Sequence, residues 1–318
     1  MQRYVSLLPS TLALLVTACG GDSGMPHATV TMSPIASTPA TSPPVSTPAV
    51  STDYTAFAGE TPVAIIGYND DAMEPLISKD GQYLLFNNSN ADPTKTDLFY
   101  ATSIDDHTFK SGGAIAGANS PALDGVASMD TTGNLYFIST RSYEKSLSTI
   151  YVAGFLAGQT NEPQLVSGVS LLQPGMLNFD AEISGDGNTL WFDDGRFSGG
   201  AVPDSATIAI ADRQSTSFMR RADGAAILAN VNTDGLNFAP SISNNGLELF
   251  FTRITDRAHP APQIYRASRA NPSAAFAAPQ RVSAIVGFVE GPSLSADGHT
   301  LYYHKLVEGK FGIYLVRR

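Results

Sequence analysis

The feature that most limits the fold of this 318-residue chain is a segment that occurs five times. Each copy joins a short apolar run to a turn of Ser, Asp, Asn or Thr that ends at glycine, and then continues into Leu and aromatic residues. The glycines are Gly81, Gly133, Gly187, Gly246 and Gly298, and subtraction of neighbouring positions gives spacings of 52, 54, 59 and 52 residues. A repeat of this length is typical of an array in which each copy is one supersecondary unit.

Each repeat contains enough apolar segments for four strands. The residues before the glycine alternate in polarity, and the Asp-Gly or Asn-Gly turn favours a tight hairpin because both residues accept positive φ. An aromatic-rich strand such as Leu84–Phe86 follows, then a third such as Leu98–Tyr100, and then a less regular fourth such as Gln164–Val166. Four strands per unit predict an all-β fold, a single β-propeller with about five four-stranded blades.

The copy EPLISKDGQYLLF from Glu74 resembles the P-x-x-S-x-D-G-x-x-L-x-F signature of the TolB-type WD40-like (PD40) repeat. The resemblance covers nearly all of residues 60–318. The second copy departs from it by lacking the proline and by having Thr131-Thr132 in the turn, and the fourth has Asn244-Asn245 there. The resemblance implies a propeller that acts through protein partners in the bacterial envelope.

The two ends of the repeat array predict a closed ring. The last copy stops after its third strand, at Val316–Arg318, and an apolar run at Val63–Ile66 precedes the first copy. We therefore expect an N-terminal strand near Val63–Ile66 to complete the C-terminal blade, because closure protects edges that an open array exposes.

The first residues resemble a bacterial lipoprotein signal. The apolar run Leu7–Val16 is shorter than the roughly 20 residues that span a bilayer, which is typical of a secretory signal. Val16-Thr17-Ala18-Cys19 resembles the lipobox, and Cys19 is the only cysteine. We expect residues 1–18 to be cleaved and Cys19 to carry the lipid; an ordinary signal peptide with an incidental cysteine is the alternative. By resemblance to the lipoproteins of Gram-negative bacteria, the presence of Gly20 and not Asp after the cysteine implies the outer membrane, facing the periplasm or the cell surface.

Composition divides the mature chain into two parts. Residues 19–52 are rich in Ser, Thr and Pro and lack aromatic residues, and this composition predicts a tether that forms no hydrophobic core. Residues 53–318 predict the TolB-like propeller. The formal net charge is −10, and basic residues do not cluster beyond two Arg pairs, so nucleic acid is excluded as a partner.

Carboxylates and one amide precede or begin the innermost strand of every blade. The Ser and Asp of the repeat turns are expected to hold hairpins, and His299 and His304, at odd spacing on one strand, are expected on opposite faces with no role in a site. Solvated loop acids are one interpretation of the carboxylates; the other is a rim that binds a cation such as Ca²⁺ or a polar ligand. The candidate rim residues are Asp71, Asp124, Asp180, Glu182, Asn237 and Glu290.

Two functions remain open from the sequence. The favoured one is a non-catalytic module, anchored to the membrane through lipid at Cys19, that binds an envelope protein, peptide or glycan. The alternative is a glycoside hydrolase-like enzyme that uses two carboxylates at the channel mouth. No G-x-S-x-G elbow or H-E-x-x-H zinc motif occurs, so no catalytic residue is assigned, and Ca²⁺ is the only cofactor considered.

Overall fold

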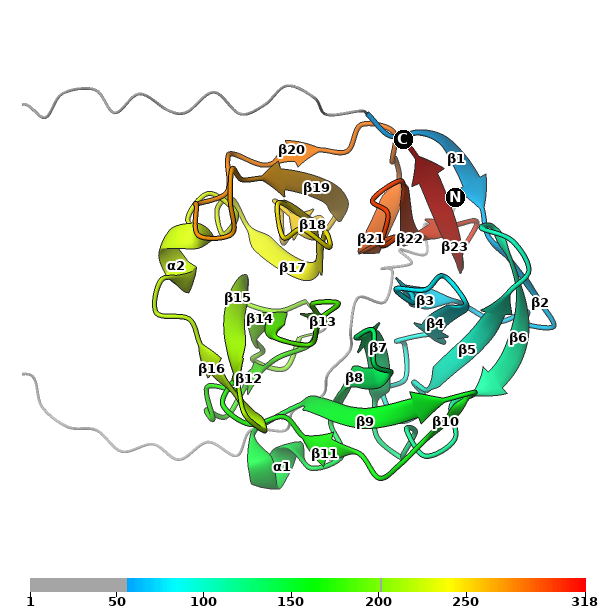
Figure 1. Ribbon diagram of the computed structural model, residues 1–318, viewed down its shortest axis with the longest axis horizontal. Helices are drawn as coiled ribbons and strands as arrows, with labels where there is room; N and C mark the ends of the chain where they lie inside the picture. The colour runs from blue at the N-terminus through cyan, green and yellow to red at the C-terminus, as the bar shows by residue number, and fades with distance from the viewer. Residues whose placement is uncertain (1–55, 201) are drawn as a thin grey trace, which may run out of the picture.

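The computed structural model describes residues 56–200 and 202–318, so the predicted signal peptide, Cys19 and the tether lie outside the described residues. Five sheets of mainly antiparallel strands surround a central axis like the blades of a propeller (Figure 1). This arrangement confirms the predicted all-β, five-bladed propeller. Within the described part of the chain, no helix is long and apolar enough to cross a membrane.

In each blade the first strand lies nearest the axis, and the later strands follow outward (Figure 1). Blade 1 contains β3 (Met73–Ile77), β4 (Tyr83–Asn87), β5 (Leu98–Ser103) and β6 (Thr108–Ala114). Blade 2 contains β7 (Asp124–Met129), β8 (Asn134–Ser139), β9 (Ile150–Leu156), β10 (Gln159–Thr160) and β11 (Gln164–Leu165). Blade 3 contains β12 (Met176–Leu177), β13 (Ala181–Ile183), β14 (Thr189–Arg196), β15 (Ser205–Gln214) and β16 (Ser217–Arg220).

The last two blades keep this order. Blade 4 contains β17 (Leu236–Ile242), β18 (Glu248–Ile254), β19 (Gln263–Ser268) and β20 (Gln280–Arg281). Blade 5 contains β21 (Phe288–Leu294), β22 (Thr300–Val307) and β23 (Lys310–Arg317). Two single-turn helices, α1 (Tyr143–Ser146) and α2 (Gly224–Ile227), lie in connections between strands.

The strand that closes the ring is β1 (Ala58–Pro62), which pairs antiparallel with β23 in blade 5. The predicted position at Val63–Ile66 was therefore wrong by a few residues. Most of that run forms β2 (Ala64–Ile66), which pairs in parallel with β6 of blade 1. The prediction followed hydrophobicity, but β1 is an outer strand with mostly exposed side chains, so its apolar pattern is weak.

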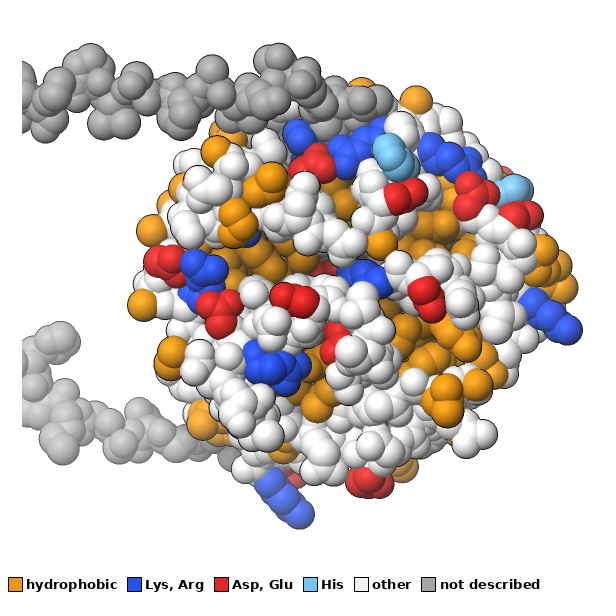
Figure 2. Space-filling view, in the orientation of Figure 1, with side chains coloured by type: hydrophobic (Ala, Val, Ile, Leu, Met, Phe, Trp, Pro, Cys, Tyr) orange, Lys and Arg blue, Asp and Glu red, His pale blue; other side chains and the backbone are white. Residues whose placement is uncertain are grey.

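The aromatic positions of the repeats fill the spaces between blades. Phe86, Phe137, Phe192, Phe251 and Tyr303 occupy the same place in their repeats and are fully buried. Neighbouring blades share clusters; in one of them Phe250 of blade 4 packs with Tyr303 of blade 5. On the face shown in Figure 2, apolar side chains also gather in a hollow between blades 1 and 2.

The Ser and Asp of the repeat turns hold hairpins, as predicted. In blade 1, Ser78 Oγ donates to Asp80 Oδ1 at 2.6 Å and accepts the Tyr83 amide at 2.9 Å. Gly81 has φ of 72°, a conformation that glycine adopts at little cost. These residues therefore serve the turn and are not free for chemistry.

Phe57, directly before β1, anchors the closing strand. Its side chain is buried and meets Phe250 edge to face at 5.7 Å, and the Arg318 guanidinium lies 4.8 Å from its ring centre. We expect Phe57→Ala to lower the free energy of unfolding by about 3–5 kcal/mol. Urea denaturation measures this change, and Leu156→Ala, at an exposed position, is the control with an expected change within about 0.5 kcal/mol. Equal losses in both variants would mean that this contact does not hold the ring closed.

Candidate functional site

The inner strands carry the same irregularity close to the axis. In blades 1, 2, 4 and 5 the pairing register shifts by a β-bulge immediately before the strand enters its regular part. One residue in each bulge has a positive φ: Glu74 (48°), Val126 (51°), Ala239 (50°) and Gly291 (62°). A bulge leaves a residue out of the ladder and redirects side chains, so these amides need acceptors from elsewhere.

A side chain on the second strand of the preceding blade supplies three of these acceptors. Asn87 Oδ1 accepts the Val126 amide at 3.0 Å, and Thr252 Oγ1 accepts the Gly291 amide at 3.2 Å. Across the closure, His304 Nδ1 accepts the Glu74 amide at 3.1 Å. Asn87, Thr252 and His304 directly follow the buried aromatic residue of the repeat, and all three are fully buried.

The inner-strand amides of blade 3 have a different acceptor, because blade 2 has Ile138 at the acceptor position and an isoleucine side chain cannot accept a hydrogen bond. The inner strand of blade 3 is split into β12 and β13, and the blade's own Asp193 accepts the amides of Phe179 at 2.9 Å and Asp180 at 3.1 Å. Asp180 Oδ2 in turn accepts the Ala239 amide of blade 4 at 3.1 Å. The missing acceptor in blade 2 thus brings two carboxyl groups together beside the axis.

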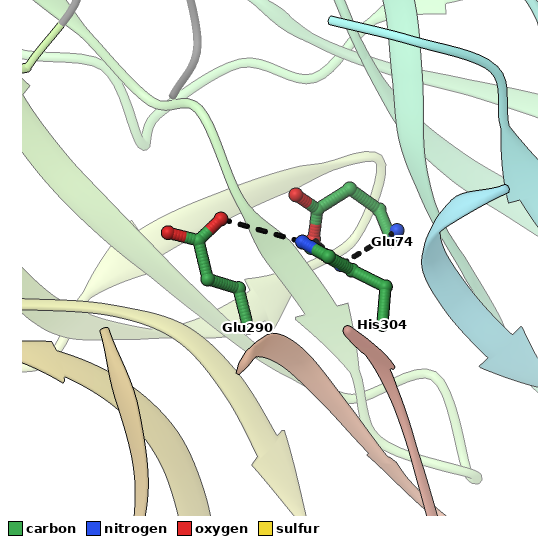
Figure 3. A group of neighbouring side chains, drawn as sticks. All are labelled: Glu74, Glu290 and His304. Carbon is green, nitrogen blue, oxygen red and sulfur yellow. Dashed lines mark hydrogen bonds and ion pairs between the residues drawn. The ribbon is translucent and has the colours of Figure 1, made fainter. Parts of the chain in front are cut away.

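His304 lies between two further carboxyl groups (Figure 3). Its Nε2 is 3.3 Å from Glu290 Oε2, an ion-pair distance without hydrogen-bond geometry, and its Nδ1 is 3.8 Å from Glu74 Oε2. Glu290 Oε1 is sealed from solvent and accepts no hydrogen bond from the described residues. We call Glu74, Asp180, Asp193, Glu290 and His304 the axial cluster.

Burial keeps protons on three of the axial carboxyl groups, those of Glu74, Asp180 and Asp193. It raises the pKa of Glu74 to about 8; His304 opposes this shift, and Asp180 and Glu290 add to it. Burial also raises the pKa of Asp193 to about 7, and together with the charge of Asp193 it raises that of Asp180 well above its usual range. Asp193 Oδ2 has no hydrogen-bond donor when both groups are ionised, so one proton retained on Asp180 satisfies the pair.

Two small cavities adjoin the cluster. We call one the acidic cavity; it measures about 30 Å³, and its walls are Glu74, Asp180 and Glu290 with Asn90, Val126, Phe179, Val202, Pro203, Phe238 and Ile254. The other, the inner cavity, also measures about 30 Å³ and is lined by Glu74, Asp180, Glu182 and Gly291 with their neighbours in the inner strands. Each has room for about one water-sized group.

The structure brings some of the predicted rim residues to these cavities. Asp180 and Glu290 line the acidic cavity, and Glu182 lines the inner one. Glu182 already has partners: Lys79 Nζ lies 2.9 Å from Oε1, and Ser128 Oγ donates to Oε2 at 2.6 Å. Of the six candidates, Asp180 and Glu290 therefore remain as groups able to meet a ligand in the acidic cavity.

The other three predicted residues line neither axial cavity. Asp124 is fully buried, pairs with Arg141 at 2.6 Å and accepts from Ser120. Asn237 Oδ1 accepts from Arg253 Nε at 2.7 Å. Asp71 accepts the Phe311 amide at 2.9 Å and lines a wider groove. Each of these side chains holds a loop or strand end in place.

Glu74 is one of the acids at the start of the innermost strands but was not among the six candidate rim residues, and His304 was expected to have no role in a site. The sequence did contain a signal, which is the position of His304 in its repeat. His304 directly follows Tyr302 and Tyr303, and the residues at these two positions belong to the core in every repeat. A polar side chain there has to face the next blade. That the next blade is blade 1, with Glu74 in its bulge, depends on ring closure.

The geometry at His304 does not suit a metal ion. Glu74, Glu290 and His304 each offer one ligand atom, and these atoms lie within 4.8 Å of one another. However, an imidazole that binds a metal through Nε2 carries its proton on Nδ1, where the Glu74 amide already donates. The proton of the neutral ring therefore lies on Nε2. The predicted Ca²⁺ site stays a prediction.

A second group with possible ligand atoms, Asp105, Asp106 and His107, lies in the turn between β5 and β6. These side chains are about half exposed, and Asp106 pairs with Arg317 at 2.6 Å. The largely apolar hollow between blades 1 and 2 measures about 340 Å³, with Tyr83 and Phe155 among its walls. Neither place gathers buried, unsatisfied polar groups as the axial cluster does.

The raised pKa of Glu74 predicts a pH-dependent stability. The folded chain keeps this proton up to about pH 8, whereas the ordinary pKa of a glutamate is 4.5, so between these values the unfolded state binds fewer protons. Stability therefore falls as pH rises through this window. We expect Glu74→Gln to reduce the slope by up to about 1.4 kcal/mol per pH unit, measured by urea denaturation at several pH values. Glu162→Gln, at an exposed position, is the control. An unchanged slope in Glu74→Gln would show that Glu74 is not the source of this pH dependence.

No family model and no curated protein matches this chain. Solved structures that resemble it include a glycoside hydrolase, with TM-score 0.56, 11% identity and coverage of 80% of this chain and 89% of that one. The catalytic domain of a Coprinopsis cinerea GH62 α-L-arabinofuranosidase has TM-score 0.53, 8% identity and coverage of 82% and 96%. TolB from Acinetobacter baumannii has TM-score 0.45, 14% identity and coverage of 78% and 55%. At these identities the likeness concerns the propeller fold alone.

Proposed function

We propose that the chain is a membrane-anchored envelope lipoprotein whose propeller is a non-catalytic binding module, with the acidic cavity at its binding site. One observation carries this proposal. The axial carboxyl groups of Asp180, Asp193 and Glu290 are more than nine-tenths buried, and the cavities beside them measure about 30 Å³ each. Such a space accepts a water-sized group of a ligand but not a sugar ring, so the chemistry that fits is recognition of a small group.

The side of the propeller that carries the acidic cavity is built from connections between strands. Asn90 lies between β4 and β5, Val202 and Pro203 lie between β14 and β15, and Ile254 ends β18. Loops on a rigid scaffold commonly carry binding residues. We propose that these loops contact an envelope protein, peptide or glycan while a small group of that ligand enters the cavity.

A glycoside hydrolase-like enzyme is the second candidate. The observation that favours it is Glu74, a carboxyl group with pKa about 8 that could donate a proton, near the second carboxyl group of Glu290. Hydrolysis requires two carboxyl groups about 5–10 Å apart on either side of a glycosidic bond. The present cavity would have to widen to admit that bond. This candidate therefore predicts that the purified chain releases reducing sugar from a polysaccharide and that Glu74→Gln abolishes the release.

The anchor is tested at Cys19. We expect Cys19→Ala to eliminate incorporation of a fatty-acid analogue and to leave the signal peptide uncleaved at that site, because the thiol is the group that carries the lipid. Metabolic labelling followed by gel analysis measures both effects, and Ser23→Ala is the control that keeps the thiol. Unchanged labelling in Cys19→Ala would show that Cys19 does not carry the lipid and would refute the proposed anchor.

The binding site is tested with a matched pair of variants in the bulges. A Cβ on Gly291 would lie 2.5 Å from Glu74 Oε2 and 3.1 Å from His304 Nδ1. Blade 4 already has an alanine, Ala239, with a similar positive φ. The backbone at position 291 can therefore accept alanine, and the main effect of Gly291→Ala is to displace the side chains of the axial cluster. We expect Gly291→Ala to lose the capture of a component from envelope extract that the wild type and Ala239→Gly retain.

Mass spectrometry of the captured material measures this difference. Equal capture by all three proteins would place binding elsewhere on the molecule and refute the proposed site. Release of reducing sugar by the wild type, lost in Glu74→Gln, would establish the enzyme in place of the binding module.

A further inference from the structure

The acidic cavity combines carboxyl groups with apolar walls. We propose that it binds the primary ammonium group of an alkyl chain, as found on a lysine side chain of a polypeptide or on a linear aliphatic amine. This inference rests on the proposed binding function and specifies the chemistry of the ligand. It follows from the hydrogen-bond acceptors, the charge, the size of the cavity and a lysine that the fold already buries.

One carboxyl oxygen at the cavity has no hydrogen-bond donor among the described residues. Glu290 is 4% exposed, yet its Oε1 accepts no hydrogen bond from the described residues. Glu74 and Asp180 line the same cavity from two other blades. An ammonium group has three N–H donors and no acceptor, so it matches a cavity lined by carboxyl oxygens from three directions. A buried acceptor without a donor is costly, which favours a ligand that donates to it.

The carboxyl groups of the acidic cavity also lack a cationic partner among the described residues, apart from His304. Among the described residues, the ion pairs of Glu74 and Glu290 are both with His304, and Asp180 forms none. Nδ1 of His304 accepts the Glu74 amide, so the ring presents Nε2 alone to Glu290. Like charges in a small space disfavour one another's ionisation, and a cation placed among them relieves that repulsion.

Size and walls select the kind of cation. The volume of about 30 Å³ exceeds the roughly 10–15 Å³ of probe volume that one water-sized group needs, which suits an ammonium head and leaves too little room for a trimethylammonium head. The walls include Val126, Val202, Pro203 and Ile254. Alkyl stems of lysine side chains pack along such apolar surfaces. Ca²⁺ would instead need six to eight oxygen ligands, and these walls provide few of them.

The fold already buries a lysine ammonium against Glu182, a residue that lines the inner cavity. Lys79, in the turn after β3 of blade 1, reaches Glu182 of blade 3 at 2.9 Å, and both side chains are 7% exposed. Ser128 Oγ donates to the other carboxylate oxygen of Glu182. At the acidic cavity the described residues supply carboxyl groups without such a lysine. A ligand from outside the chain can complete that pairing.

The first test needs no variant. Isothermal titration calorimetry of the purified full chain measures the binding of n-butylammonium and of tetramethylammonium, which has the same charge and a bulkier head. We expect n-butylammonium to bind at least about tenfold more tightly. Equal affinities, no binding of n-butylammonium, or binding of Ca²⁺ alone would overturn the inference.

A matched pair of variants locates the site. We expect Glu290→Gln to weaken n-butylammonium binding at least about tenfold, and Asp297→Asn, in an exposed turn of the same blade, to leave it unchanged. Urea denaturation checks that both variants fold, and Glu74→Gln replaces Glu290→Gln if the latter does not. Equal effects of the two changes would show that the amine binds through general charge alone.

Proton release gives an independent readout. Glu74 faces His304, Asp180 and Glu290, and its pKa of about 8 means that it has to lose a proton when the ammonium binds. The apparent affinity should therefore rise from about pH 6 to about pH 9 and then fall as the amine itself loses its proton. Titrations in two buffers with different ionisation enthalpies measure the released protons. A pH-independent affinity would contradict the inference.

The last comparison separates this inference from the proposed function. A short peptide with one lysine that binds more tightly than n-butylammonium indicates a polypeptide ligand, and equal or weaker binding indicates a small amine; both support an ammonium site. If Gly291→Ala loses its captured component but excess n-butylammonium does not displace that component from the wild type, the ammonium inference fails while the binding function stands. If capture does not depend on Gly291, the proposed function itself fails.

Discussion

The rest of the site depends on a backbone amide at each inner-strand bulge that cannot pair within its own sheet. Near the axis these amides are buried, and an amide without a partner there costs roughly 1–3 kcal/mol. Each blade therefore needs an acceptor at one place in its sequence, and in four blades that acceptor comes from the preceding blade. The same hydrogen bonds join neighbouring blades and determine which side chains reach the axis.

The chemical nature of each acceptor decides whether the axis is inert or reactive. Asn87 and Thr252 accept an amide and carry no charge, so these two acceptors contribute structure alone. His304 performs the same task but adds an ionisable ring, and the lack of an acceptor at Ile138 places Asp193 beside Asp180. The axial cluster thus arises from requirements of the backbone. Its raised carboxyl pKa values follow from the burial that those requirements impose.

Much of the fold could be predicted because its rules are local. Hairpin turns such as Ser78–Gly81 and the aromatic strands repeat at a regular spacing, so the blade count follows from the repeats. The closing strand was misplaced because β1 is largely exposed and hydrophobicity does not mark it. Within the candidate site, Asp180 and Glu290 could be nominated as acids near the inner strands, whereas similar acids such as Asp124 are taken up by neighbouring groups such as Arg141.

The sequence by itself therefore determined the class of fold, the number of blades, the turn chemistry and a set of acids near one end of the inner strands. The tertiary structure decided which of those acids are buried without a hydrogen-bond or ion-pair partner and which of them are paired. Glu74 and His304 are separated by 230 residues, and they meet only because the last blade closes against the first. Side chains that far apart leave no periodic trace in the chain, since their contact depends on the closure of the ring and not on local spacing.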